Sequence, residues 1–368
     1  MKKIIAIITS FWIVIVTGGH VWAQSENMEA VITAVEDTKT VVPAGGGPAQ
    51  VSQNLRLLIT SGDKKGQEIT LENDNAPVAN LRQYQLGDKV VLYNQPETEN
   101  YTIADVVRRP VLAWLFAIFV VAAIVVGHWQ GVTSLLGLAA SFVLIFFWIV
   151  PRVASGSNPI VMVTAGCLII IPIMFLLSHG WNKTTLVAMV ATLMAMMFTG
   201  GLIVIFVQWA RLTGLASEEA GFLLAMNPDL LDFRQLLAAG MLFATLGVLD
   251  DVTISQAAIV SELKKTDPTL DFWRLYAGAS KLGRDHIASM INTLILVYAG
   301  ASFPLLVLFN QSRESLSLVL NYEIIADEIV RTLTGSIGLI MAVPLTTLLA
   351  CLVETTKFRA GARRPHHK

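Results

Sequence analysis

The sequence predicts an α-helical polytopic membrane bundle of about seven spans, preceded by a small all-β, OB-like exported domain. Hydrophobic residues make up 54% of the 368 residues, charged residues only 14%, and the mean hydropathy is +0.62. Most apolar residues come in blocks of about 20, the length that crosses a bilayer core. Residues 24–109 are instead polar, with short alternating runs. The chain therefore divides into an exported polar domain and a membrane domain.

The first 23 residues have the three regions of a secretory signal. Lys2 and Lys3 precede the apolar run 4–16, and small residues follow up to Ala23, after which cleavage is expected. The alternative is an uncleaved first helix. Both interpretations keep the two lysines inside and place the following segment outside, so the predicted topology does not depend on cleavage.

Residues 24–109 contain five runs with the alternation and composition of β-strands. Turn-forming stretches such as 44–48, 61–63 and 86–88 separate them. Five short strands in a segment of this length favour a small barrel of the OB type. Because a fold alone does not assign a ligand, we expect a structural or protein-contact module, with an envelope protein as its partner. The predicted strands are 30–35, 50–59, 67–71, 89–93 and 101–107.

Seven apolar blocks follow within residues 110–354, and residues 355–368 form a basic tail. The shortest link, 127–131, predicts a tight hairpin that makes the first two helices antiparallel neighbours. His128 and His179 fall in links between blocks and are interpreted as interfacial residues. The predicted spans are 111–126, 132–150, 160–177, 185–207, 235–258, 287–309 and 333–353.

The distribution of basic residues predicts the orientation of these spans. With the β domain outside, the inner loops and tail hold eleven Lys and Arg residues, and the outer loops with the stretch before the first span hold seven. Acidic residues such as Asp327 and Glu328 fall in the outer loops but contribute little to the rule. The excess inside predicts a multi-pass plasma-membrane protein with an extracytoplasmic N-terminal domain and a cytoplasmic C-terminus.

Composition and motifs argue against several classes of function. A net charge of −1 without a long basic tract argues against a nucleic-acid partner. Cys167 and Cys351 both lie in apolar spans, which indicates packing rather than a metal pair. Neither a His-Glu-x-x-His motif nor a Gly-x-Ser-x-Gly elbow occurs, so the sequence predicts no enzyme, no bound metal and no cofactor. An intramembrane acid dyad is the remaining enzymatic alternative.

Two adjacent carboxylates, Asp250 and Asp251, interrupt the span 235–258. An aspartate near the centre of a membrane helix costs about 2.5–3.5 kcal/mol, whereas each large apolar residue returns only about 0.3–0.6 kcal/mol. Ionisable residues retained at such positions usually serve a function. Counted from Gln235, Asp250 lies 15 residues along the helix, or about 22 Å.

Small residues share one face of this helix with Asp251. They recur at spacings of three and four, which lets neighbouring backbones approach closely. We therefore expect Asp251 to point into a helix contact, while Asp250, about 100° round the axis, points elsewhere. Because the two side chains diverge, a metal cage built from this pair is a weak hypothesis. The residues of this small-residue face are Gly240, Ala244, Gly247, Asp251, Ser255 and Ala258.

The next span supplies polar partners for the aspartates. Asp285, Ser289 and Asn292 are spaced i, i+4, i+7 and share a face. Counted from Phe309, Asn292 lies at about the depth of the two aspartates, with Asp285 and His286 one to two turns deeper. These residues predict a polar link from the inner surface to the aspartates. The alternative is that Asp285 and His286 only mark the interfacial end of a helix.

Four stretches of the chain carry a family likeness: 211–219, 246–256, 283–285 and 292–296. Together they resemble the YibE/F family of bacterial multi-pass membrane proteins, over about residues 111–353. The resemblance implies a multi-pass membrane architecture in which the family's acidic position falls on Asp251.

Two hypotheses for the function follow. The first is a solute or ion permease, which proton coupling would suit, with a small ion or a proton as substrate. The second is a non-transporting envelope scaffold, in which the β domain binds a partner and the aspartates lock helices together. In the first, Asp251 is the principal cation- or proton-handling group, Asp250 and Asp285 are secondary acids, Asn292 and Ser255 are polar partners, and His286 is an inner-side relay.

Overall fold

The computed structural model describes residues 28–41, 50–62, 64–74, 83–95, 100–226, 231–312 and 314–361. The chain divides into two compact units, Met1–Ala122 and Ala123–Lys368. The expected signal segment, residues 1–23, and residues 362–368 of the basic tail lie outside the described residues.

The first unit contains a five-stranded antiparallel sheet with the order β3-β2-β1-β4-β5. Central strand β1 (Met28–Val41) pairs with β2 (Gln50–Ile59) and β4 (Lys89–Gln95), and β3 (Glu68–Asp74) and β5 (Asn100–Val106) end the order. All five predicted strands are confirmed. Alternate side chains fill one core because successive residues of a strand point to opposite faces. They include Ala30, Ile32, Leu55, Leu57, Val90 and Leu92.

Helix α2 (Arg109–Leu144) begins in the first unit and continues into the second. It leaves helical geometry at His128, with φ 46° and ψ −127°. This break falls in the link 127–131, where the sequence predicts a hairpin. A β-carbon at Gly131 would lie 2.0 Å from the carbonyl oxygen of Ala123, so the chain passes itself at a distance that only glycine allows.

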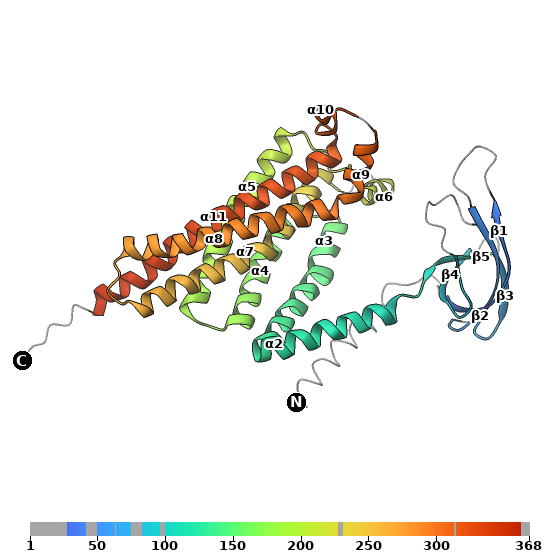
Figure 1. The fold of residues 1–368 in the computed structure, drawn as a ribbon, viewed down its shortest axis with the longest axis horizontal. Coiled ribbons are helices and arrows are strands. Elements are labelled where there is room, and N and C mark those ends of the chain that lie inside the picture. Colours follow the sequence, from blue (N-terminus) through green and yellow to red (C-terminus); the bar gives the residue numbers. More distant parts are fainter. Residues whose placement is uncertain are drawn as a thin grey trace, which may run out of the picture. The chain divides into compact units, whose positions relative to one another are not determined.

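The second unit is a bundle of long helices (Figure 1). Helices α7, α8 and α11 run alongside one another, and α6, α9 and α10 lie at the end of the bundle opposite the α7–α8 connection. After α2, the elements in order are η2 (Ile145–Ile149), α3 (Val150–Ala154), α4 (Pro159–His179), α5 (Lys183–Trp209), α6 (Glu218–Met226), α7 (Phe233–Thr266), α8 (Phe272–Ala301), α9 (Phe303–Ser312), α10 (Leu316–Val319) and α11 (Glu323–Gly361).

Among the described residues, five helices are long and apolar enough to cross a membrane, or six if α8 and α9 form one broken span, bent by 64°. The sequence predicts seven spans. The difference lies in the 46-residue apolar stretch Arg109–Ala154, which contains the first two predicted spans and the break at His128.

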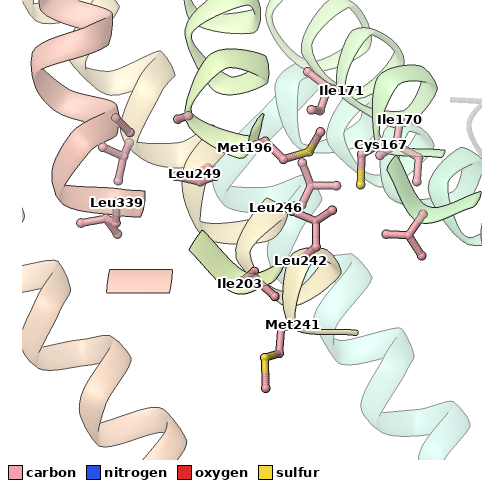
Figure 2. Close-up of a cluster of buried hydrophobic side chains, with 14 of the residues drawn as sticks. Cys167, Ile170, Ile171, Met196, Ile203, Met241, Leu242, Leu246, Leu249 and Leu339 are labelled. Carbon is pink, nitrogen blue, oxygen red and sulfur yellow. The ribbon is translucent and has the colours of Figure 1, made fainter. Parts of the chain in front are cut away.

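The apolar core of the bundle is centred on α7. Its buried leucines point toward α4, α5 and α11, so α7 is the helix that the other three cover. Figure 2 shows Leu242, Leu246 and Leu249 of α7 among Cys167 and Ile170 of α4, Met196 and Ile203 of α5, and Leu339 of α11.

Glycines let α11 approach α5 and α7 closely. A β-carbon at Gly338 would lie 2.0 Å from Oγ1 of Thr199 on α5, and one at Gly335 would lie 3.2 Å from Cγ2 of Thr245 on α7. Small residues have this role in membrane bundles, where packing rather than water exclusion holds helices together. The backbones of α5, α7 and α11 are therefore held close by specific residue pairs.

Candidate functional site

Helix α7 positions both predicted aspartates. Asp232 caps its start by accepting a hydrogen bond from the backbone N–H of Gln235 (3.0 Å), and Lys264 and Lys265 occupy its last turn, where positive charge suits the helix dipole. The 34 residues of α7 extend for about 51 Å, well beyond the roughly 30 Å of a bilayer core. The aspartates lie near the middle of this length.

Asp250 and Asp251 point in different directions. Asp250 is half-buried, and its Oδ1 accepts a hydrogen bond from the backbone N–H of Asp251 at 2.9 Å. Asp251 is exposed and lies two residues, or about 200°, round the axis from the buried Leu249. Asp251 therefore faces away from the apolar core.

Two histidines from other helices interact electrostatically with Asp251. His179 is the last residue of α4, where its ring packs against Phe175 with centroids 6.2 Å apart. His286 is half-buried on α8. Helices α4 and α8 thus each place one imidazole within electrostatic range of the Asp251 carboxylate. Imidazole is the side chain whose ordinary pKa lies nearest neutral pH.

The sequence interpretation missed His179, which it treated as an interfacial residue. Counting residues from the start of each helix would have indicated it. His179 lies 20 residues from Pro159 and Asp251 lies 18 residues from Phe233, so both are about 27–30 Å along their helices. Two helices that start at the same surface bring such residues to a similar depth.

The register of α8 differs from the one expected. The count from Phe309 placed Asn292 level with the aspartates, but the residue that interacts with Asp251 is His286. The reason is the 64° bend between α8 and α9, which removes α9 from the straight span. Counted from the end of α8 at Ala301, a distance of 15 residues reaches His286.

The other candidate residues are not bonded to the aspartates. Asp285 and Asn292 are exposed on α8, and Ser255 is half-buried on α7. Within the described ranges, none of the three forms a hydrogen bond with Asp250 or Asp251. In the same part of the chain, no group of three or more His, Cys, Asp or Glu side chains could hold a metal ion.

The small-residue face of α7 is exposed rather than packed. Gly240, Ala244, Gly247, Asp251 and Ala258 are all exposed, Ser255 is half-buried, and a β-carbon at either glycine would meet nothing within 4 Å. The prediction that this face packs against another helix is wrong for the residues described. The close helix approach in this bundle uses the glycines of α11, which meet α5 and the opposite face of α7.

Buried polar side chains on that opposite face are bonded. The Gln256 amide nitrogen donates to the carbonyl oxygen of Ala279 (3.1 Å) and to Oγ1 of Thr347 (2.8 Å). The hydroxyls of Thr192 and Thr253 bond each other at 2.6 Å. These contacts tie α7 to α8, α11 and α5. We interpret them as packing interactions.

The long apolar helices and the charged groups set among them define a multi-span integral membrane protein. A family model described as YibE/F-like protein matches residues 115–356, more than half of the chain. The chain belongs to the YibE/F family, as its motifs indicated. Neither a curated protein nor a solved structure matches it.

Proposed function

We propose that the protein is a proton-coupled solute or ion permease in which Asp251 is the principal proton- or cation-binding group. The observation that carries this proposal is that Asp251, exposed on an apolar helix, interacts with His179 of α4 and His286 of α8. A carboxylate is costly in lipid unless water or a positive charge meets it. Histidines beside it provide that charge when they are protonated.

The other polar residues have secondary roles in this proposal. Asp250 fixes the backbone at Asp251 through its 2.9 Å hydrogen bond and acts as a second acid. His286 relays protons on the inner side, and His179 does the same from α4. Asp285, Asn292 and Ser255 are assigned as further polar groups along the path. The proposal assigns no catalytic reaction and no cofactor.

We further propose that the membrane domain has seven spans, a number that the helix lengths support. A straight helix from Arg109 to Ala154 would measure about 69 Å, more than twice the thickness of a bilayer core. We take the break at His128 as the boundary between two spans. With α4, α5, α7 and α11, and with α8 and α9 as one broken span, the total is seven, which puts the two ends of the membrane domain on opposite sides.

We further propose a plasma-membrane location with the β domain outside and the C-terminus in the cytoplasm. The excess of basic residues in the inner loops and the expected signal segment support this orientation. The sheet order β3-β2-β1-β4-β5 supports a partly open OB-type barrel. In this proposal its role is contact with an envelope protein.

The test is proton movement in proteoliposomes that hold the full-length chain and a trapped pH-sensitive dye. After a pH jump, Na+, K+ and Mg2+ are added outside, one at a time. We expect movement in the native chain and at least a tenfold lower rate in Asp251→Asn, with reduced rates in His179→Gln and His286→Gln. Glu218→Gln, an exposed acid on α6, serves as the matched control. A native rate in Asp251→Asn would remove its proposed role.

A non-transporting scaffold is the second candidate, and the exposed small-residue face favours it. Gly240 and Gly247 leave open space on α7 that a partner's helix could fill. In this case Asp251→Asn retains function, since an amide still forms hydrogen bonds, whereas deletion of residues 24–108 abolishes function. Retained function after that deletion would reject the scaffold.

A further inference from the structure

Asp327, in the second turn of α11, is a buried acid that the permease proposal does not use. Its side chain is only 7% exposed, and its Oδ1 is buried without a hydrogen-bond partner. The sequence places this residue in an outer loop, where a carboxylate would be solvated. In the structure it lies inside one of the apolar helices.

The charged neighbours of Asp327 are engaged with other groups. Glu323, Glu328 and Arg331 interact with it electrostatically, and all three lie on α11. Glu328 is paired with Arg331 at 2.7 Å. Glu323 Oε1 accepts hydrogen bonds from the backbone N–H and hydroxyl of Thr213 and from the backbone N–H of Gly214. Two of the three acids therefore have donors and Asp327 has none.

Other elements bring no second cation to this acid in the described part of the chain. Tyr298 of α8 faces Arg331 and Glu328. Arg234, at the start of α7, donates from Nε to the carbonyl oxygen of Leu212. Three acids and one arginine leave the cluster with a net charge of −2 when all are ionised, and one of the carboxylates has a buried oxygen without a donor.

A buried carboxylate oxygen without a donor is expensive, and a positive charge relieves that cost. Divalent cations require several oxygen ligands, and the carboxylates of Glu323 and Glu328 already bind protein donors. A proton needs only the one free oxygen. We propose that Asp327 is a proton-binding site, separate from Asp251 and located at the end of the bundle where α11 begins.

The separation of the two sites follows from the helix register. Gly335 lies beside Thr245, and Thr347 bonds Gln256, so α7 and α11 run parallel. Asp327 precedes Gly335 by eight residues and Asp251 follows Thr245 by six, which gives about 21 Å along the bundle. Chains of proton-binding side chains across the membrane occur in pumps and transporters. A role of Asp327 in such a chain depends on the proposed function, whereas proton binding by Asp327 does not.

The experiment is infrared difference spectroscopy of the full-length chain in lipid nanodiscs, with 13C-labelled aspartate carboxyls and titration from acid to alkaline pH. We expect a protonated-carboxyl band that persists at neutral pH, that disappears in Asp327→Asn, and that remains in Asp251→Asn and in Glu218→Gln. Because no flux is measured, failure of the permease proposal would leave this result unchanged. An identical band in native chain and Asp327→Asn would overturn the proposal.

Two further arms keep the test decisive. Loss of the band when Na+ or K+ is added at constant pH would show a metal-cation site and overturn the proton assignment. If Asp327→Asn does not fold, the native chain is treated with an apolar carbodiimide, which reacts with protonated carboxyls, and its peptides are mapped by mass spectrometry. Modification of Asp327 that falls as pH rises supports the proposal, and absence of modification at every pH overturns it.

Discussion

The two faces of α7 differ in the burial and hydrogen bonding of their polar side chains. On the face toward α5, α8 and α11, Gln256 and Thr253 are buried and their polar atoms are bonded across helices. On the other face, Asp251 is exposed and two glycines meet open space. A buried polar group that is bonded stabilises a particular packing, whereas one that is left exposed in an apolar helix is retained for another reason. Substitutions on the first face should cost stability, and those on the second should cost function.

The largest expected loss of stability is in Gly338→Ala. Its new β-carbon would lie 2.0 Å from Thr199 Oγ1 and 3.0 Å from Thr199 Cβ, so α11 and α5 must move apart. Overpacking of this kind costs about 1–3 kcal/mol. Thermal unfolding of the purified chain in detergent measures the loss, and adding Thr199→Ala should recover part of it.

Gly240→Ala is the matched control on the opposite face. Nothing lies within 4 Å of the added β-carbon, and alanine suits a helix better than glycine. The melting temperature should stay the same or rise. If Gly240→Ala lost as much stability as Gly338→Ala, the exposed face would be packed in the assembled protein and the comparison between the two faces would fail.

Gln256→Leu should cause the second largest loss. It removes the hydrogen bonds to the carbonyl oxygen of Ala279 and to Oγ1 of Thr347, which together contribute about 1–3 kcal/mol. Asp251→Leu, five residues away, should not lower the melting temperature because the carboxylate has no buried partner. The same two variants measured for flux should rank in the opposite order. Equal melting temperatures for both would contradict the assignment of Gln256 to packing.

The sequence predicts the elements of this fold better than the faces of its helices. The alternation of apolar and polar residues predicts all five β-strands, because each strand has one buried side. The length of the apolar blocks predicts the long helices, because the thickness of the bilayer core sets the length of a spanning helix. The small-residue face was misassigned, since Gly240 and Gly247 have the spacing of a contact whether or not a neighbour is present. Gly335 and Gly338 do make contacts, and these contacts depend on where α11 packs.

The candidate site could be predicted only in part for a similar reason. Two carboxylates in an apolar helix are conspicuous in a sequence, so Asp250 and Asp251 were found. His179 and His286 depend on the depth at which separate helices meet, and that depth depends on the bend between α8 and α9. Asp327 was assigned to a loop because the position at which α11 begins is a tertiary property, fixed in part by the bonds of Glu323 to Thr213 and Gly214.

A smaller effect is expected for the hydroxyl pair of Thr192 and Thr253. Valine keeps the shape of threonine, so Thr192→Val, Thr253→Val and the double variant remove only the 2.6 Å hydrogen bond and local bonds to each helix's own backbone. Interhelical hydrogen bonds in membrane proteins contribute about 0.6 kcal/mol on average. A double-mutant cycle in unfolding free energy measures the coupling. A coupling of zero would mean that this bond does not hold α5 to α7.

The smallest effect concerns Asp267, at the C-terminal end of α7, which supplies a solvated reference for the acids within the bundle. The Thr269 hydroxyl and backbone N–H both donate to its carboxylate, at 2.5 and 2.9 Å, and lower the pKa of Asp267. Because the folded-state pKa lies below the unfolded-state pKa, the stability gained is present above the unfolded value and is lost as pH falls through the folded value. Thr269→Val should therefore reduce the drop in melting temperature between neutral and acid pH. An unchanged drop would mean that the Thr269 hydroxyl contributes no stability through Asp267.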